Sequence, residues 1–187
     1  MDRVQNAFEV VERVKFVRPE YEKVSSADVP LPIGYFQTIS QPTTVRLMLD
    51  WLDLDIKQKV LDVGSGSGWS TALLAYIVGD EGYVYGVEIV PELVEFGRKN
   101  IHRAGITNAT IFQAGKKYGL QEYAPFDRIL VSATAKEIPN DLKSQLKIGG
   151  KMVIPIGEDI LELTRERRNK WHIIKHEGFL FVPLKKL

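Results

Sequence analysis

A glycine-rich turn next to acidic residues is the part of this sequence best suited to bind a small molecule. The run Val60–Val63 has the composition of a buried strand, and three alternate glycines, Gly64, Gly66 and Gly68, lead from it into helix-forming residues. Glycine lets the backbone turn sharply beside a ligand without a Cβ in the way. Because a helix start presents unpaired N–H groups, the turn favours an anionic group such as a phosphate or a carboxylate.

Two details of the turn distinguish between these anions. The spacing is G-x-G-x-G rather than the G-x-G-x-x-G of dinucleotide-binding proteins, and Asp62 stands two residues before the first glycine. A carboxylate at that place would repel a pyrophosphate but attract an ammonium group. S-adenosylmethionine joins a carboxylate and an ammonium to a nucleoside, so we expect it as the cofactor. A phosphate or flavin loop stays open as the alternative for the glycines alone.

A second acidic residue supports the expectation that the ligand contains a nucleoside. Glu88 ends the apolar run that starts at Tyr83, 24 residues after Gly64, where a βαβ unit places an acid on the ribose hydroxyls. The alternative is a solvated acid at the end of a strand. The expected cofactor-binding residues around the two motifs are Asp62, Gly64, Ser65, Gly66, Gly68, Glu88 and Ile89.

Composition limits the class of protein. With 187 residues, 44% of them hydrophobic and 26% charged, the chain fits one globular domain. A net charge of +1 gives no general attraction to nucleic acid, although Arg165, Arg167, Arg168 and Lys170 form a local basic turn. The sequence contains no cysteine, which excludes a disulfide, a thiolate nucleophile and a zinc–sulfur site.

Two further expectations concern metals and location. No carboxylate cluster accompanies His102, His172 and His176, so we expect no metal site. The start of the chain lacks the apolar core of a signal peptide, and no apolar run approaches the length of a membrane span. We expect a soluble, cytoplasmic protein without membrane contact.

The elements that must position these residues alternate between strand and helix. Strands are expected at 60–63, 83–88, 109–113, 126–131 and 151–154, and an antiparallel pair is expected around Arg168-Asn169. The predicted fold is α/β: a doubly wound, mostly parallel sheet of Rossmann-like methyltransferase type, with an antiparallel C-terminal strand pair and an N-terminal helical extension. The whole chain, 1–187, forms one domain, divided into a substrate-side extension (1–52) and a nucleotide-binding core (53–187).

The extension carries its own helix signals. Val4, Phe8 and Val11 predict an amphipathic helix over residues 2–14. A second helix is expected after Ser40, which has the properties of an N-cap because Pro42 follows in the first turn.

Several motifs are much more specific than the glycine turn, above all Gln37–Pro42 and the closing Phe181–Leu184. Through them the chain resembles, over nearly its whole length, the protein-L-isoaspartate O-methyltransferase family. The other segments that carry the resemblance are Ala7-Phe8, Phe16-Val17, Glu20-Tyr21, Pro30–Gly34, Ala124–Asp127, Gln145–Gly150 and Ile154–Gly157.

The resemblance implies an activity and a set of substrate-side residues. The α-carboxylate of an L-isoaspartyl residue in a damaged protein or peptide attacks the sulfonium methyl in line, giving a methyl ester and S-adenosylhomocysteine. A carboxylate with a pKa near 4 is already ionised at neutral pH, so no general base is required. Ser40 is the implied catalytic residue, and Thr38, Ile39, Ser40 and Val182 are the implied substrate-binding residues.

The chain departs from the family pattern at two places. Where the family usually has Gly-Asp-Gly, with the aspartate accepting from the adenine amino group, this chain has Ala114-Gly115-Lys116. Gly115 cannot accept that hydrogen bond, although we still place Gly115 and Lys116 beside the cofactor. Lys136 stands where the family tends to have proline. These changes bear on adenine contacts and on substrate choice.

Three other functions stay open at this point. The chain could be a methyltransferase that acts on RNA, helped by the basic turn, or one that acts on a small molecule such as a corrinoid. The third is a cofactor-binding homologue with reduced activity, in which Gly115 reflects lost affinity. The oligomeric state cannot be read from the sequence.

Overall fold

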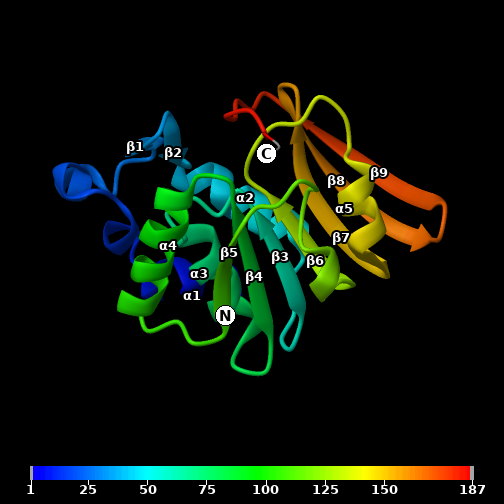
Figure 1. Cartoon of the computed structure of the whole chain (residues 1–187), viewed down its shortest axis with the longest axis horizontal. Coiled ribbons are helices and arrows are strands. Elements are labelled where there is room, and N and C mark those ends of the chain that lie inside the picture. Colours follow the sequence, from blue (N-terminus) through cyan, green and yellow to red (C-terminus); the bar gives the residue numbers. More distant parts are fainter. Residues whose placement is uncertain (1, 186–187) are drawn as a thin grey trace.

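The computed structural model describes residues 2–185 as a seven-stranded sheet covered by helices on both faces (Figure 1). The strands lie in the order β5-β4-β3-β6-β7-β8-β9, and a separate two-stranded sheet joins β1 and β2. The strands are β1 Leu31–Gly34, β2 Gln37–Ile39, β3 Lys59–Val63, β4 Tyr83–Glu88, β5 Ala109–Gln113, β6 Phe126–Val131, β7 Leu146–Ile156, β8 Asp159–Arg167 and β9 Lys170–Glu177.

The helices are α1 Arg3–Val10, α2 Pro42–Leu52, α3 Trp69–Val78, α4 Pro91–Arg103 and α5 Asn140–Gln145, with short 3₁₀ turns at Arg13–Phe16, Pro19–Val24 and Gln121–Tyr123. From α2 to β7 the helices alternate with the strands, except between β5 and β6, where the structure has only a 3₁₀ turn. No helix within residues 2–185 has both the length and the apolar character that crossing a membrane requires.

The sheet is parallel from β5 to β7 and antiparallel at its other edge. β3 pairs in parallel with both β4 and β6, while β8 runs antiparallel to β7 and to β9. The fold class predicted from the sequence is therefore confirmed, including the turn at Arg168-Asn169 between β8 and β9.

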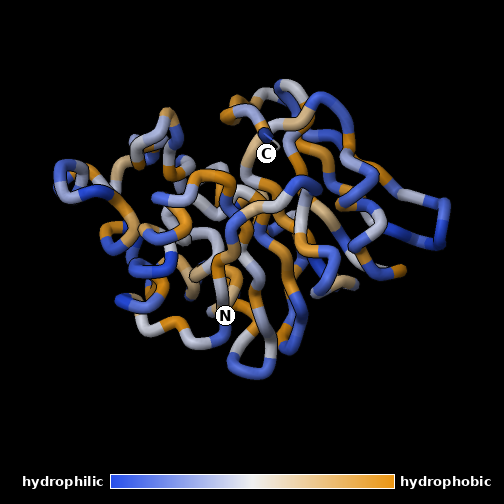
Figure 2. The backbone as a smooth tube through the Cα atoms, in the orientation of Figure 1, coloured by the Kyte–Doolittle hydropathy of each residue, from blue (hydrophilic) through white to orange (hydrophobic). Residues whose placement is uncertain are grey.

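The hydrophobic core forms two clusters, one on each face of the sheet. The first packs α1, α2, α3 and α4 against one face and includes Phe16, Leu49 and Leu73. The second joins Leu142 of α5 to Phe126 and Ile129 of β6 on the other face. The central strands are mostly apolar, whereas the far end of the β8–β9 hairpin is hydrophilic (Figure 2).

The N-terminal helix is shorter than the sequence predicts. The apolar spacing favours a helix over residues 2–14, but α1 ends at Val10, and residues 13–16 form a separate 3₁₀ turn. Extended backbone at Glu12 separates the two, which lets the Arg13 side chain turn inward. Tertiary packing thus overrides the local helical preference.

The C-terminal segment returns from the edge of the sheet to its centre. His176 of β9 stacks on Trp51 of α2 with ring centroids 3.7 Å apart, and Phe179 packs edge-on against the same indole. Thr134 N donates to the carbonyl of Val182 at 2.8 Å, and Leu184 N donates back to Thr134 at 2.8 Å. These contacts place residues 182–184 beside the loop that follows β6.

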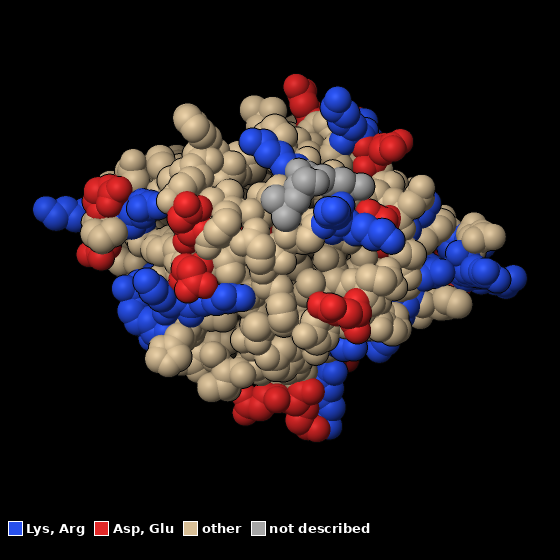
Figure 3. All heavy atoms as spheres, viewed as in Figure 1, with Lys and Arg blue, Asp and Glu red and all other residues tan. Residues whose placement is uncertain are grey.

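Charges of both signs are spread over the face shown in Figure 3, with no single-sign field across it. One group of basic side chains lies toward the left of that view, and another gathers at the far end of the β8–β9 hairpin. Within the hairpin group Lys170 pairs with Glu166, and the Arg165 guanidinium lies over the Trp171 ring.

Candidate functional site

A cavity opens at the carboxyl ends of β3, β4 and β6, where the strand order reverses on either side of β3. This is the place where open α/β sheets bind ligands. The cavity and its open mouth together take up about 1030 Å³. Its lining includes the ends of the central strands, the hairpin strand β2 with Ser40, the loop after β5, and the C-terminal residues 182–185.

The glycine turn forms the floor of the cavity, and its backbone requires glycine. Gly64, Gly66 and Gly68 have φ angles of +82°, +50° and +85°, in the left-handed region that side chains disfavour. A Cβ on Gly68 would also lie 3.0 Å from the carbonyl oxygen of Gly97 in α4. Gly64 and Gly66 line the cavity, whereas Gly68 packs against α4 and begins α3.

Glu88 lies in the cavity wall with its carboxylate fixed by backbone groups. Its Oε2 accepts from Gly66 N at 2.9 Å, and its Oε1 accepts from Ile89 N at 2.7 Å and Val90 N at 2.9 Å. A carboxylate offers about four acceptor sites, so it keeps acceptor capacity for a ligand. Only 5% of Glu88 is exposed, which makes it a fixed negative group at the edge of the cavity.

Asp62 lies beneath the glycine turn rather than in the cavity wall. It is fully buried, and its Oδ2 accepts from the hydroxyls of Ser70 at 2.7 Å and Thr71 at 2.6 Å. Among the described residues Oδ1 has no hydrogen-bond partner. Burial raises the pKa of Asp62 to about 6, the two hydroxyls oppose that rise, and the charge of Glu88 adds to it. The residue therefore contributes negative potential under the loop, at a place without direct access to the cavity.

Ser40 does not cap the following helix, contrary to the sequence prediction. The N-cap of α2 is Gln41, and Asp28 supplies the capping carboxylate: its Oδ1 accepts from Thr43 N at 2.8 Å. The hydrogen bonds from Thr43 and Gln41 lower the pKa of Asp28. Asp28 gave no local signal in the sequence because its main partner lies 15 residues further on.

The Ser40 hydroxyl is consequently free for another role. Ser40 lines the cavity, and no hydrogen bond joins its hydroxyl to another group within residues 2–185. Thr38, Ile39 and Val182 line the same cavity, so the structure brings the four expected substrate-side residues together. Ile39 is buried, whereas Thr38 is exposed at the mouth.

Arg13 holds the segment that carries Ser40, a function that the sequence reading missed. Its guanidinium donates to five carbonyl oxygens: those of Ser25 (2.8 Å), Ala27 (3.1 Å), Val29 (2.9 Å), Ile39 (3.5 Å) and Ser40 (3.0 Å). It also lies over the Trp69 ring, 5.4 Å from the centroid. Burial lowers the pKa of Arg13 to about 10, so the group stays charged at neutral pH.

The loop after β5 forms another wall, with differences from the expected residues. Ala114 and Gly115 line the cavity, and no atom lies within 4 Å of a Cβ built on Gly115. Lys116 is exposed and is not among the lining residues, whereas its neighbour Lys117 is. Lys136 is likewise exposed and outside the cavity lining.

Comparison with known proteins agrees with this arrangement. The profile of the family "Protein-L-isoaspartate(D-aspartate) O-methyltransferase (PCMT)" matches residues 1–187. A protein-L-isoaspartate O-methyltransferase of Methanothrix thermoacetophila is 45% identical to this chain over 98% of its length and 88% of the relative's.

Solved structures give the same result. A Plasmodium falciparum structure, described as a protein-L-isoaspartate O-methyltransferase in complex with S-adenosyl-L-homocysteine, matches with a TM-score of 0.86 and 31% identity over 100% of this chain and 92% of that one. Another protein-L-isoaspartate O-methyltransferase matches with a TM-score of 0.90 and 26% identity; this chain is covered over 99%, and spans 62% of that longer chain.

Proposed function

Because the chain belongs to the protein-L-isoaspartate(D-aspartate) O-methyltransferase family, we propose that it methylates the α-carboxylate of L-isoaspartyl residues in polypeptides, with Glu88 and Ser40 acting in one cavity that both of them line. The observation that supports these roles is the shared cavity itself. A fixed acid suited to ribose hydroxyls and a free hydroxyl suited to a carboxylate line the same space. S-adenosylmethionine is the methyl donor of the family.

The residues present fit the methyl donor at its ribose and its methionine end. Glu88 keeps acceptor capacity at the cavity wall, and Gly64 and Gly66 leave room beside the backbone. Asp62, with one buried oxygen unpartnered, adds negative potential beneath the turn, which favours the ammonium group. Gly115 supplies no side-chain acceptor for the adenine. When bound, S-adenosylmethionine supplies an electrophilic methyl group on a sulfonium.

The chain's own residues then position the substrate and exclude water. The isoaspartyl carboxylate is ionised at neutral pH, so no side chain has to remove a proton. We assign to Ser40 the orientation of this carboxylate by a donated hydrogen bond. Ile33, Val45 and Met48 give the cavity an apolar wall, which limits hydration of the two opposite charges that react. Alignment of two reactants in such a site can lower a barrier by several kcal/mol.

Partners and location follow from the same proposal. The substrates are polypeptides that contain isoaspartyl residues, and we place the reaction in the cytoplasm, where S-adenosylmethionine is available. Nucleic acid is not part of the proposal, because the basic hairpin of β8 and β9 lies at the edge of the sheet (Figure 1), and none of Arg165, Arg167, Arg168 and Lys170 lines the cavity.

Ser40→Ala tests the role of the hydroxyl. A hydrogen bond to a charged group is worth about 1.5–3 kcal/mol, so we expect turnover of an isoaspartyl peptide to fall roughly 10- to 150-fold. Affinity for S-adenosylhomocysteine and the melting temperature should stay unchanged, since Asp28 rather than Ser40 caps α2. Ser144→Ala, on α5, is the matched control. Turnover at the parental rate in folded Ser40→Ala protein would remove Ser40 from the mechanism.

A further inference from the structure

Two aromatic residues form the turn between β1 and β2 in a conformation that costs stability. Tyr35 and Phe36 have φ angles of +55° and +58°, the left-handed region that tight hairpins usually fill with Asn-Gly. Phe36 is completely exposed, at 102% of its reference area, and Tyr35 is 47% exposed. Among the described residues neither belongs to a hydrophobic cluster. Folding therefore gains nothing from burial of the Phe36 ring.

The turn is nevertheless held firmly beside the cavity. Ile33 and Ile39, on the two strands of the hairpin, are buried, and Arg18 Nε donates to the Ile33 carbonyl at 2.6 Å. The chain passes from Phe36 directly to Gln37 and Thr38, which line the cavity. Figure 1 shows the hairpin rising from the body of the molecule on the side opposite β8 and β9. A strained, exposed and anchored segment at a binding site is characteristic of a contact made with a ligand.

A second exposed apolar residue lies near Ser40, in the C-terminal segment. Leu180 is 85% exposed and comes just before Phe181 and Val182. It lines a shallow depression that adjoins the cavity through shared walls at Thr38, Ser40 and Val182. Exposed apolar side chains thus occur both in the hairpin turn next to Gln37 and Thr38 and in the C-terminal segment next to Val182, and all three of these neighbours line the cavity.

We propose that Tyr35, Phe36 and Leu180, here named the mouth clasp, bind apolar side chains next to the isoaspartyl residue of the substrate. The occupant is an extended polypeptide segment. In an extended chain the modified residue can enter the cavity while the apolar residues before and after it stay outside, where they can contact the mouth clasp. This inference rests on the proposed function and adds a specificity to it. The enzyme prefers isoaspartyl sites flanked by apolar residues, which folded proteins bury and unfolded chains expose.

Phe36→Gly should stabilise the folded protein but weaken the binding of an apolar peptide substrate. Glycine adopts the positive φ without strain, so the melting temperature should rise by about 2–4 °C. The KM for an isoaspartyl peptide with leucine on both sides should rise about ten-fold, because the variant lacks the ring that the bound peptide would partly cover. The KM for the same peptide with glycine on both sides should not change, nor should affinity for S-adenosylhomocysteine.

Two other variants complete the experiment. Leu180→Ser should raise the KM for the leucine-flanked peptide selectively as well, while Ile148→Ser, an exposed apolar residue on β7 outside the cavity, should leave both peptides unaffected. Equal effects of Phe36→Gly on both peptides, or no effect on either, overturn the mouth clasp. A parent protein that methylates both peptides without preference overturns the clasp alone, whereas one inactive on both overturns the proposed function and the clasp with it.

Discussion

Asp62 combines complete burial with only partial hydrogen bonding, and this gives the protein a pH dependence. Its pKa in the folded state is about 6, above the usual value of about 3.9. Between these values the native state binds more protons than the unfolded state, so stability falls as the pH rises from about 4 through 6. The difference in pKa corresponds to roughly 3 kcal/mol.

We expect Asp62→Asn to remove this dependence. The amide oxygen still accepts from Ser70 and Thr71, but it carries no charge that burial penalises. The unfolding free energy of the variant relative to the parent should therefore increase by roughly 3 kcal/mol between pH 4 and pH 7, measured by urea denaturation. Parallel curves for the two proteins over this range would mean that Asp62 titrates normally.

Gly115 is a second single residue with a measurable consequence, which is the affinity for S-adenosylhomocysteine. The family's aspartate at this position accepts from the adenine amino group, and an unsatisfied donor costs about 1–3 kcal/mol. A side chain at Gly115 has open space, and its φ lies outside the left-handed range, so no strain opposes the change. Gly115→Asp should bind S-adenosylhomocysteine about ten-fold more tightly in calorimetric titration. Equal affinity would show that another group already holds the adenine.

The sequence predicts the positions and contacts of some site residues better than those of others. The glycine turn and Glu88 follow from spacing alone, because a βαβ unit fixes where they meet. The roles of Asp28 and Arg13 depend on partners 12 to 27 residues away, and no local pattern encodes such pairings. Ser40 was predicted as a cap from a valid local rule, but Asp28 provides a charged acceptor for the same N–H.

At the scale of elements, Arg13 connects three segments that have no strand or helix hydrogen bonds between them. It binds carbonyls at residues 25–29 and at the end of β2, and so sets the position of Ser40 relative to the sheet. Lysine keeps the charge but cannot reach this set of carbonyls, because it lacks the planar fork of donors.

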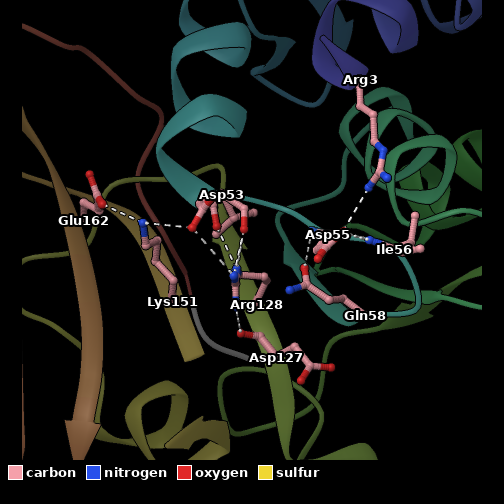
Figure 4. A network of polar contacts seen from close by, with 10 residues as sticks. Arg3, Asp53, Asp55, Ile56, Gln58, Asp127, Arg128, Lys151 and Glu162 are labelled. Carbon is pink, nitrogen blue, oxygen red and sulfur yellow. Dashed lines mark hydrogen bonds and ion pairs between the residues drawn. The ribbon is translucent and has the colours of Figure 1, made fainter. Parts of the chain in front are cut away.

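Arg13→Lys should therefore lower kcat/KM for isoaspartyl peptides at least ten-fold, with unchanged affinity for S-adenosylhomocysteine. Arg128→Lys is a matched control, because Arg128 also donates to carbonyls, those of Leu52, Asp53 and Asp127, but does not line the cavity. Figure 4 shows its guanidinium beside Asp53 at the end of α2. Both variants should lose stability, since buried carbonyls lose their partners. Equal kinetics for the two at a temperature where both are folded would leave Arg13 a purely structural role.

The central strands were predictable because burial on both faces leaves a nearly continuous apolar run bounded by glycine and proline. Expected ranges such as 83–88 and 109–113 coincide with β4 and β5. The N-terminal region was less predictable, because the end of α1 and the 3₁₀ turn that follows depend on where Arg13 is buried.

At the scale of the whole molecule, the cavity joins the N-terminal extension, the central strands and the C-terminal segment. A ligand that binds there links all three, so it should stabilise the folded chain as a unit. S-adenosylhomocysteine at 100 times its Kd should add about 2.7 kcal/mol to the free energy of unfolding and raise the melting temperature.

Glu88→Ala should weaken the binding of S-adenosylhomocysteine by about 1.5–3 kcal/mol in calorimetric titration, and unchanged affinity would exclude Glu88 as the ribose ligand.

The central claim is that this cavity presents an isoaspartyl carboxylate to a methyl donor. The most direct test is transfer of tritiated methyl from S-adenosylmethionine to two peptides of identical sequence, one with an isoaspartyl and one with a normal aspartyl residue. We expect base-labile methyl ester on the isoaspartyl peptide and none on its isomer, with labelling that is slower by about ten-fold or more in Ser40→Ala. Equal labelling of both peptides, or of neither, would contradict the account.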